Sequence, residues 1–534
     1  MVYESKYPPR NVPKTTSIFN ILFHNDQQVS KDKLIYVDIE DTNKCLTFGQ
    51  VETQILKAAA GLMREFNLKK GDVVAICSPN QVDYPIILHG AVCAGGVVAT
   101  IDQMSSVDLM AADLDTVQAK VLIAHKDTLE TSLAAAKLIG LSESNILVFG
   151  DLGVDKIRTV NETILSQDEL ATPLEFTEQE MINNPAFLYF TSGTTGRKKA
   201  VMITQNNILN SLFFKDWDFK DMNLLGYTEY HHASSLLTNM HLSVYLGLTT
   251  YVMPHYTLRN FCAAVEKFKI NMTTTQPFII SALAKDAIAS EYDLSSLKFV
   301  ICCGAALDNS VTHTVKERLG LLIMNAYGMT EVLGLFESNP EITEANGIGY
   351  LASGFSARLV DDDGNDVPIG QMGELWVKGP TVARGYYRNP EATASTFGAD
   401  GYLRTGDLVK CDENGMFYYV DRFKDLIKYR LYHIYPSDIE TVLMTHPKVA
   451  DCAAIGVYYP EYTTELPRAY VHLVDGEKYT EDVQRELQEY ADSRLSDEKR
   501  LRGGVVIVDS FPRTASGKIQ RRALRQEAKD SFLV

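Results

Sequence analysis

A run of small hydroxyl residues and glycines, followed by positive charges, is the clearest candidate for chemistry in this sequence. An apolar stretch ends near Phe190 and leads into Thr-Ser-Gly-Thr-Thr-Gly at 191–196 and Arg-Lys-Lys at 197–199. Glycines and hydroxyl side chains allow N–H and O–H groups to surround phosphate oxygens, and a nearby lysine offsets their charge. The spacing does not fit the G-x-x-x-x-G-K-[ST] loop. By residue type alone, the run is therefore either a plain turn or a phosphate-binding loop.

Five further motifs follow in the second half of the chain. They read AYGMTE (326–331), GELWVKGPTVARGYY (373–387), TGDL (405–408), DRFKDLIKY (421–429) and PRTASGKIQRRAL (512–524). Together with TSGTTGRKK, this ordered set resembles the adenylate-forming superfamily of acyl- and aryl-CoA ligases, firefly luciferase and non-ribosomal adenylation domains. The resemblance extends over residues 185 to 525, and the overall residue pattern is most similar to that of 4-coumarate–CoA-ligase-like members.

The resemblance implies a reaction in two steps. A carboxylic acid attacks the α-phosphate of ATP to give an acyl-adenylate and pyrophosphate, and the thiol of coenzyme A then displaces AMP. Because an anion approaches a polyanion, Mg²⁺ and cationic side chains are expected to stabilise the charge. The expected partners are ATP, Mg²⁺, coenzyme A and an aryl, arylpropenoic or medium-chain acid.

The resemblance also implies roles for individual residues around the nucleotide. Thr330 would contact the α-phosphate, Glu331 would bind Mg²⁺, and Tyr327 would lie near adenine. Asp407 would accept hydrogen bonds from the ribose hydroxyls, and Arg422 would support the ribose or a phosphate. The phosphate-loop residues would be Thr191, Ser192, Gly193, Thr194, Thr195, Gly196 and Lys199, with Lys198 adding charge near pyrophosphate. If the motifs are set aside, Thr330 could equally cap a helix, Tyr327 could be a core residue, and Asp407 could belong to a turn.

Three lysines of the C-terminal region have distinct implied roles. Lys518 in SGKI would reach the carboxylate and the α-phosphate during adenylation. In the family the C-terminal domain rotates between two poses, with Lys424 at the hinge and Lys428 presented to the site in the second pose. The alternative interpretation of all three is a solvated surface lysine.

The pocket for the acid is marked less clearly. His232 in YHHASSLL resembles the histidine at the acid-binding wall of the family, although His231 beside it leaves the register open by one residue. The eleven histidines show no carboxylate or cysteine partner at ligand spacing, which argues against a zinc site. The other residues expected to line the cavity are Ser234, Ser235, Gly304, Ala326, Val332 and Leu333.

One departure from the family pattern bears on the second step. The family strand usually continues I-K-x-x-G, but here it reads Ile427-Lys428-Tyr429-Arg430-Leu431. A glycine allows a thin ligand to pass close to the backbone, whereas the leucine adds bulk where the pantetheine arm is expected. Leu431 thus favours an alternative in which the acyl group passes to an amine or to oxygen. A second alternative, a non-catalytic nucleotide-binding member, is disfavoured by Lys518, Glu331 and Asp407.

The elements that would position these residues change in character along the chain. Short β-rich runs at 73–78, 96–101, 120–125 and 298–304 alternate with helical patterns, which predicts parallel sheets covered by helices. From about residue 347, strands joined by Asp-Gly and Pro-Ile-Gly turns predict a small β-barrel-like subdomain. We therefore expect an α/β protein with a large domain over 1–420 and a small mobile α+β domain over 421–534, hinged near Lys424. The first element expected in the small domain is a single strand over 425–434.

Composition excludes several classes of protein. A chain of 534 residues with 46% apolar residues and a net charge of −17 is an ordinary globular composition and a poor one for binding nucleic acid. Residues 421–534 hold 18 Lys and Arg against 19 Asp and Glu, so the acidity belongs to the large domain. Apolar residues at 84–101 are interrupted by glycines and predict a buried helix, turn and strand rather than a membrane span. Eight cysteines without a C-x-x-C pair, no signal peptide and no S-K-L tail predict an intracellular, most simply cytoplasmic protein.

Overall fold

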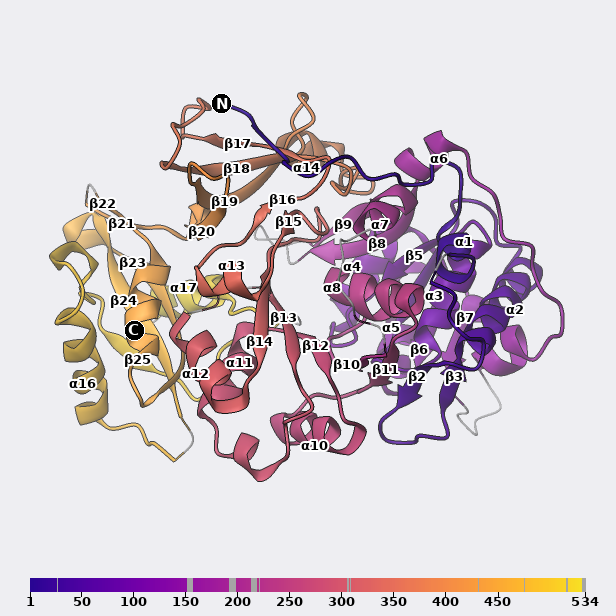
Figure 1. The fold of residues 1–534 in the computed structure, drawn as a ribbon, viewed down its shortest axis with the longest axis horizontal. Coiled ribbons are helices and arrows are strands. Elements are labelled where there is room, and N and C mark those ends of the chain that lie inside the picture. The colour runs from indigo at the N-terminus through magenta and orange to yellow at the C-terminus, as the bar shows by residue number, and fades with distance from the viewer. Residues whose placement is uncertain are drawn as a thin grey trace.

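The computed structural model describes residues 1–25, 27–150, 157–191, 198–212, 219, 221–304, 307, 309–430, 432–474, 476–514 and 517–530. Two helix-covered sheets formed by the first part of the chain occupy the right and centre of Figure 1. A five-stranded sheet lies at the top of that view, and the C-terminal residues form a separate unit at the left.

The first sheet has six strands and is mostly parallel. Its order is β7 (Ile146–Phe149), β6 (Ala119–His125), β4 (Val73–Cys77), β5 (Val97–Thr100), β8 (Pro185–Thr191) and β9 (Lys199–Thr204). Neighbouring strands are parallel except β8 and β9, which are antiparallel and pair Thr191 with Lys199. The strands predicted near 73, 96 and 120 are confirmed.

Both faces of this sheet are buried, as expected for parallel strands that read as continuous apolar runs. On one face, Val74 and Ile76 of β4 pack with α2 (Phe48–Phe66) and α3 (Tyr84–Cys93). On the other, Val73 and Ala75 pack with α4 (Val107–Val117) and α5 (Leu129–Ile139). Successive side chains of a strand point to opposite faces, so a single apolar run supplies both cores.

The second sheet has seven strands and follows the same plan. Its order is β14 (Leu322–Ala326), β13 (Phe299–Cys303), β12 (Met272–Thr275), β10 (Asn223–Gly226), β11 (Thr249–Val252), β2 (Leu34–Asp38) and β3 (Cys45–Thr47). Only β2 and β3 pair antiparallel among these strands. The helices α10 (Leu258–Phe268), α11 (Pro277–Lys285) and α12 (Asn309–Leu319) contribute to its core. The strand predicted near 298–304 is confirmed.

The third sheet is antiparallel and corresponds to the predicted β-rich subdomain. Its order is β1 (Tyr3–Glu4), β17 (Ser356–Val360), β18 (Met372–Lys378), β19 (Leu403–Cys411) and β20 (Phe417–Arg422). The pairing of Tyr3 with Ala357 brings the start of the chain to this sheet, which the local pattern did not predict. The remaining α-helices and strands described in residues 1–420 are α1 (Ile18–Phe23), α6 (Glu178–Asn183), α7 (Gln205–Leu212), α8 (Ala233–Ser235), α9 (Ser243–Leu246), α13 (Pro340–Glu344), α14 (Pro390–Thr396), β15 (Phe336–Glu337) and β16 (Tyr350–Leu351).

The C-terminal unit has its own α+β core. The strands β23 (Val449–Tyr459), β24 (Thr464–Leu473) and β25 (Val505–Ile507) form one sheet. It packs with α15 (Pro436–Met444), α16 (Glu481–Asp492) and α17 (Arg521–Asp530). The expected α/β class, with helix-flanked sheets, a β-rich subdomain and a C-terminal α+β unit, is confirmed.

The single strand expected over 425–434 is wrong. The structure instead has two short strands, β21 (Ile427–Tyr429) and β22 (Tyr432–Ile434), which pair antiparallel as a hairpin. The chain reverses after Tyr429, where Arg430 adopts a left-handed backbone with φ of 54°. The prediction failed because the sequence there lacks the Gly or Asn that usually marks such a turn.

The C-terminal unit contacts the helix α11, which packs on the second sheet. The Nζ atom of Lys285, at the end of α11, donates hydrogen bonds to the carbonyl oxygens of Met444 (3.1 Å) and Val449 (2.9 Å). The first of these carbonyls ends α15, where a positive charge interacts favourably with the helix dipole. The guanidinium of Arg513 also lies 4.9 Å from the ring centre of Phe278 in α11.

The predicted helix–turn–strand over 84–101 is confirmed as α3 and β5, and all ten residues of α3 are buried. In the part of the chain that the structure describes, every helix is too short or too polar to cross a membrane. The crossing of α3 with α2 is close: a Cβ atom placed on Gly90 would lie 2.5 Å from the Cβ atom of Ala58. Glycine at this position lets the two helices approach.

We predict that Gly90→Ala lowers the midpoint of thermal unfolding, although alanine favours a helix over glycine by about 1 kcal/mol. The added methyl group overpacks the crossing, which costs about 1–3 kcal/mol. Ala58→Gly removes the opposing methyl group but itself costs about 1 kcal/mol of helix stability, so the double variant should lose less stability than the sum of the two single losses. Losses that simply add would contradict the assigned contact.

Candidate active site

A cleft of about 3040 Å³ lies where the ends of the sheets meet the C-terminal unit. Three strands end at it: β8 at Thr191, β13 before Gly304, and β14 before Tyr327. Ligands of α/β proteins bind outside the carboxyl ends of parallel strands, and the cleft occupies that position. Of the predicted site residues, those that line it are Thr191, Lys199, His232, Ser234, Gly304, Ala326, Tyr327, Thr330, Glu331, Val332, Leu333, Asp407, Arg422, Lys424 and Lys518.

Lys518 enters the cleft from the loop that precedes α17. Its Cε atom would be 3.7 Å from a Cβ atom on Gly304, a residue with φ of 96°. Two hydrogen bonds brace the loop: the Lys518 N–H donates to the Thr514 hydroxyl (3.1 Å), and the Thr514 N–H donates to the Lys518 carbonyl (2.8 Å). Burial lowers the pKa of the Lys518 ammonium below its usual value, and the charge of Arg422 lowers it further.

Asp407 is the most enclosed acid of the site, with 3% of its surface exposed. One carboxylate oxygen accepts a hydrogen bond from the hydroxyl of Tyr327 (2.6 Å), and the other lies 2.8 Å from Nε of Arg422. Asp407 and Arg422 are also cross-strand partners in β19 and β20. Burial lowers the pKa of Arg422, but Asp407 and Tyr419 outweigh burial, so that the guanidinium titrates above its usual range.

The Tyr327 ring belongs to an aromatic group beside Asp407. It packs edge-on against Phe336, with 5.4 Å between ring centres, and lies 6.5 Å from Tyr419. All three rings line the cleft. Burial raises the pKa of the Tyr327 hydroxyl well above its usual value, and Asp407 adds to the shift, so this hydroxyl remains a hydrogen-bond donor.

Glu331 lies in the turn after β14 and is 6% exposed. Its carboxylate accepts a hydrogen bond from the hydroxyl of Tyr386 (2.7 Å), and Nζ of Lys199 lies 4.3 Å from the centre of the Tyr386 ring. Tyr386 therefore joins an acid and a cation that the motifs identified separately. The family resemblance assigned no role to Tyr386, although this residue lies within the GELWVKGPTVARGYY motif.

Lys198, which is expected to add charge near pyrophosphate, borders the cleft and contacts acidic side chains there. Its Nζ atom donates hydrogen bonds to the Ser105 hydroxyl (3.0 Å) and the Asp113 carboxylate (3.1 Å) and lies 3.7 Å from Asp102. Adjacent residues entering a strand point to opposite sides, so Lys198 and Lys199 meet different partners. Its charge is engaged by these acids.

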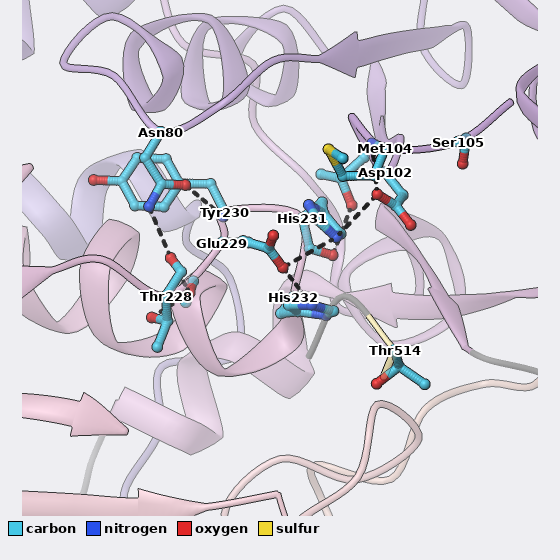
Figure 2. Close-up of polar contacts among 12 residues, drawn as sticks. Asn80, Asp102, Met104, Ser105, Thr228, Glu229, Tyr230, His231, His232 and Thr514 are labelled. Atoms are coloured by element: carbon cyan, nitrogen blue, oxygen red, sulfur yellow. Dashed lines mark hydrogen bonds and ion pairs between the residues drawn. The ribbon is translucent and has the colours of Figure 1, made fainter. Parts of the chain in front are cut away.

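The two neighbouring histidines both line the cleft but differ in their surroundings. His231 is buried and its Nε2 atom has no hydrogen-bond partner among the described residues. His232 is half-buried, and its Nε2–H donates to the carboxylate of Glu229 (3.1 Å), as Figure 2 shows. Burial lowers the pKa of His231 well below its usual value, followed by the effects of His232 and Lys198.

The expectation that the histidines lack a carboxylate partner at ligand spacing is wrong. Glu229, His231 and His232 place one potential ligand atom each within 4.8 Å of one another. Glu229 precedes the histidines by two and three residues, and only the turn between them brings its carboxylate back. A backbone hydrogen bond from the His232 N–H to the Glu229 carbonyl (3.0 Å) closes that turn.

Ser235 and Lys428 do not line the cleft as described. The hydroxyl of Ser235 is buried and bonded to the hydroxyl (2.7 Å) and carbonyl (3.0 Å) of Thr228, so the expected pocket role is wrong. The side chain of Lys428 in β21 is exposed. Lys424 lies in the turn at 423–425, between β20 and β21. Ser192, Gly193, Thr194, Thr195, Gly196 and Leu431 lie outside the described residues.

Comparison with known proteins agrees with this arrangement. Residues 23–387 match the model of a family described as AMP-binding enzyme, and residues 438–518 match that of its C-terminal domain. The chain is 33% identical to the phenylacetyl-CoA ligase epaB of Aspergillus niger, over 94% of this chain and 95% of that protein. It is 28% identical to the probable 4-coumarate–CoA ligase 3 of Dictyostelium discoideum, over 98% and 97%.

The fold is also similar to that of a solved structure. The anthranilate CoA ligase AuaEII, crystallised with anthranoyl-AMP, superposes with a TM-score of 0.88 at 24% identity. The match covers 98% of this chain and 99% of that one. At this identity the likeness concerns the fold.

We predict that Arg422→Met lowers the midpoint of unfolding measured without ligands, because it leaves the buried Asp407 carboxylate without its counter-charge. Breaking a buried pair costs about 3–5 kcal/mol, and the one-third exposure of Arg422 places the loss toward the low end. Adding Asp407→Asn removes the unpaired charge and should restore part of the stability. A double variant less stable than Arg422→Met would contradict this account.

Proposed function

The chain belongs to the AMP-binding enzyme family, and from this premise we propose that it is an AMP-forming acid–CoA ligase. It activates a carboxylic acid with ATP as an acyl-adenylate and transfers the acyl group to coenzyme A. The observation that carries the proposal is the convergence of Lys518 with Arg422, Asp407 and Glu331 in one cleft. ATP and coenzyme A are intracellular metabolites, so the proposed reaction also places the enzyme inside the cell.

Asp407 would hold the ribose of the nucleotide. A carboxylate offers about four lone-pair positions. The Tyr327 hydroxyl uses one of them, whereas the oxygen paired with Arg422 accepts no hydrogen bond from the described residues. The remaining positions are available to the ribose hydroxyls. Arg422 supplies the counter-charge of the carboxylate, and Tyr327, Phe336 and Tyr419 supply an aromatic wall suited to the adenine ring.

Glu331 would bind the Mg²⁺ that accompanies ATP. A hard carboxylate oxygen suits this ion, which commonly binds through one or two carboxylates together with substrate phosphates. The Glu331 side chain fits because it borders the cleft and one of its oxygens is fixed by Tyr386. When bound, the ion supplies positive charge at the phosphates.

The first step requires positive charge where the carboxylate oxygen meets the α-phosphorus. The new C–O–P linkage forms as the bond from the α-phosphorus to the pyrophosphate oxygen breaks. Lys518 would stabilise the carboxylate and the α-phosphate, Thr330 would donate to the α-phosphate, and Lys199 would face the departing pyrophosphate. We also propose that residues 192–196 bind the phosphates of ATP.

The second step would use a different arrangement of the C-terminal unit. We take the division between 1–420 and 421–534 as a domain boundary, with Lys424 in the turn that follows Arg422 as the hinge. Rotation there would remove Lys518 from the cleft and bring the exposed Lys428 toward it. The thiol of coenzyme A would then attack the acyl carbon, AMP would leave, and the thiol proton would pass to solvent.

The acid would occupy an apolar part of the cleft beside Ala326. There Phe219, Leu246, Ile301 and Met324 form one cluster with Ala326, and all five border the cleft. Burying a ring or an aliphatic chain against such side chains is favourable by about 25 cal/mol per Å². An aryl, arylpropenoic or medium-chain acid fits this wall, with His232, Ser234, Gly304, Val332 and Leu333 as its other expected neighbours.

We predict that Lys518→Ala slows acid-dependent pyrophosphate release by about three orders of magnitude. The estimate follows from one charge at about 4 Å, which is worth roughly 4 kcal/mol at an effective dielectric of 20. Thioester formation from supplied acyl-adenylate should change far less. Lys529→Ala, an exposed lysine of α17, is the matched control and should affect neither step. Equal loss in both steps would contradict the two-pose assignment.

We predict acid-dependent pyrophosphate release from a panel of aryl, arylpropenoic and medium-chain acids, followed by thioester formation when coenzyme A is added. Release without thioester would instead favour transfer to another acceptor, the alternative suggested by Leu431. In that case Leu431→Gly should restore thioester formation without changing pyrophosphate release. Failure of every acid in the panel to release pyrophosphate would refute the proposed enzyme.

A further inference from the structure

The segment Glu229-Tyr230-His231-His232 forms a cluster of potential metal ligands on one side of the cleft. Nε2 of His232 lies 3.1 Å from a Glu229 carboxylate oxygen, and Nε2 of His231 lies 3.8 Å from the same oxygen. In a tetrahedral site with ligands at about 2.0–2.2 Å from the ion, ligand atoms are about 3.3–3.6 Å apart. Shifts of a few tenths of an ångström would bring the two measured separations to these values.

The chain holds this segment in place by hydrogen bonds that do not involve the three ligand atoms. The Tyr230 N–H donates to the side-chain oxygen of Asn80 (2.9 Å), whose amide donates to the Thr228 carbonyl (3.0 Å). The Tyr189 hydroxyl donates to the Tyr230 carbonyl (3.2 Å). Figure 2 shows Glu229, His231 and His232 converging beside this support. The ligand atoms are therefore brought together by the fold.

The polar groups of the cluster are incompletely satisfied by the described residues. The buried Nε2 atom of His231 lies between two carboxylates, 3.8 Å from Glu229 and 3.9 Å from Asp102, and is hydrogen-bonded to neither. In the described ranges, no Lys or Arg nitrogen lies within 4.0 Å of Glu229. Lys198, the nearby cation, contacts Asp102 and Asp113. A divalent cation would satisfy His231 and offset the charge of Glu229.

We propose that Glu229, His231 and His232 bind a divalent transition-metal ion, with Zn²⁺ as the best match to two imidazoles and one carboxylate. Imidazole nitrogen is a preferred ligand of this ion, and two histidines with one glutamate are a known zinc-binding set. Both histidines border the cleft, so a fourth ligand would come from water or from an oxygen donor of a molecule bound there. This site is separate from Glu331 and does not depend on the proposed function.

Metal binding to the whole chain tests this inference directly. Protein freed of metal with a chelator is titrated with Zn²⁺ by calorimetry in excess Mg²⁺, which occupies hard oxygen sites such as Glu331. One Zn²⁺ per chain is expected. Substitution with Co²⁺ should give the visible absorption of nitrogen and oxygen ligands. Intense sulfur-to-cobalt charge transfer would place the ion on cysteines and overturn the assignment, as would the absence of saturable binding.

Two variants identify the ligands, and one serves as a control. His232→Ala and Glu229→Gln should each weaken Zn²⁺ binding by more than about 100-fold, since loss of an outer-shell partner alone costs about 10–100-fold. Glu229→Gln keeps an oxygen that accepts from His232, so folding is preserved and is checked by circular dichroism. His313→Ala, in an exposed His–Glu pair with Glu317, should bind as the parent does. Unchanged binding in folded Glu229→Gln would refute the site.

Discussion

The buried carboxylate of Asp407 joins three segments that are far apart in the sequence. It accepts from Tyr327 after β14, belongs to β19, and pairs with Arg422 at the end of β20. A buried charge is tolerated only when it is paired and hydrogen-bonded, so these contacts are mutually required. Arg422 is also the last residue before the turn that leads to the C-terminal unit. The same acid therefore connects the aromatic wall of the cleft to the segment that leads into the C-terminal unit.

Much of the fold follows from local sequence patterns. Apolar runs such as Val73–Cys77 fill two cores because both faces of a parallel strand are buried. The motifs located most of the cleft residues because their order carries the family resemblance. Local patterns missed the pairing of β1 with β17 and the reversal at Arg430, which depend on distant contacts or an atypical turn residue. Local patterns also missed Glu229 as the carboxylate partner of the two histidines, because only the turn of the folded backbone brings its side chain close to them.

The net charge of the chain and the charge of the cleft have opposite signs. The large net negative charge lies on residues 1–420, yet the cleft brings together Lys199, Arg422 and Lys518. Lys198 and Lys199 illustrate the distinction: one is anchored to Asp102 and Asp113, and the other lies over the Tyr386 ring at the cleft. A polyanionic ligand responds to the nearby cations more strongly than to distant acids, because exposed charges are screened within about 10 Å.

The hydrogen bonds of Lys285 have a consequence for how the chain can vary. Their acceptors are main-chain carbonyls of Met444 and Val449, which are present whatever side chain occupies those positions. Substitutions along the facing edge of the C-terminal unit leave these acceptors intact, provided that α15 still ends at the same place. The two hydrogen bonds therefore survive such substitutions, while a change at position 285 itself removes both. This part of the junction is specified by one side chain and by the position of one helix end.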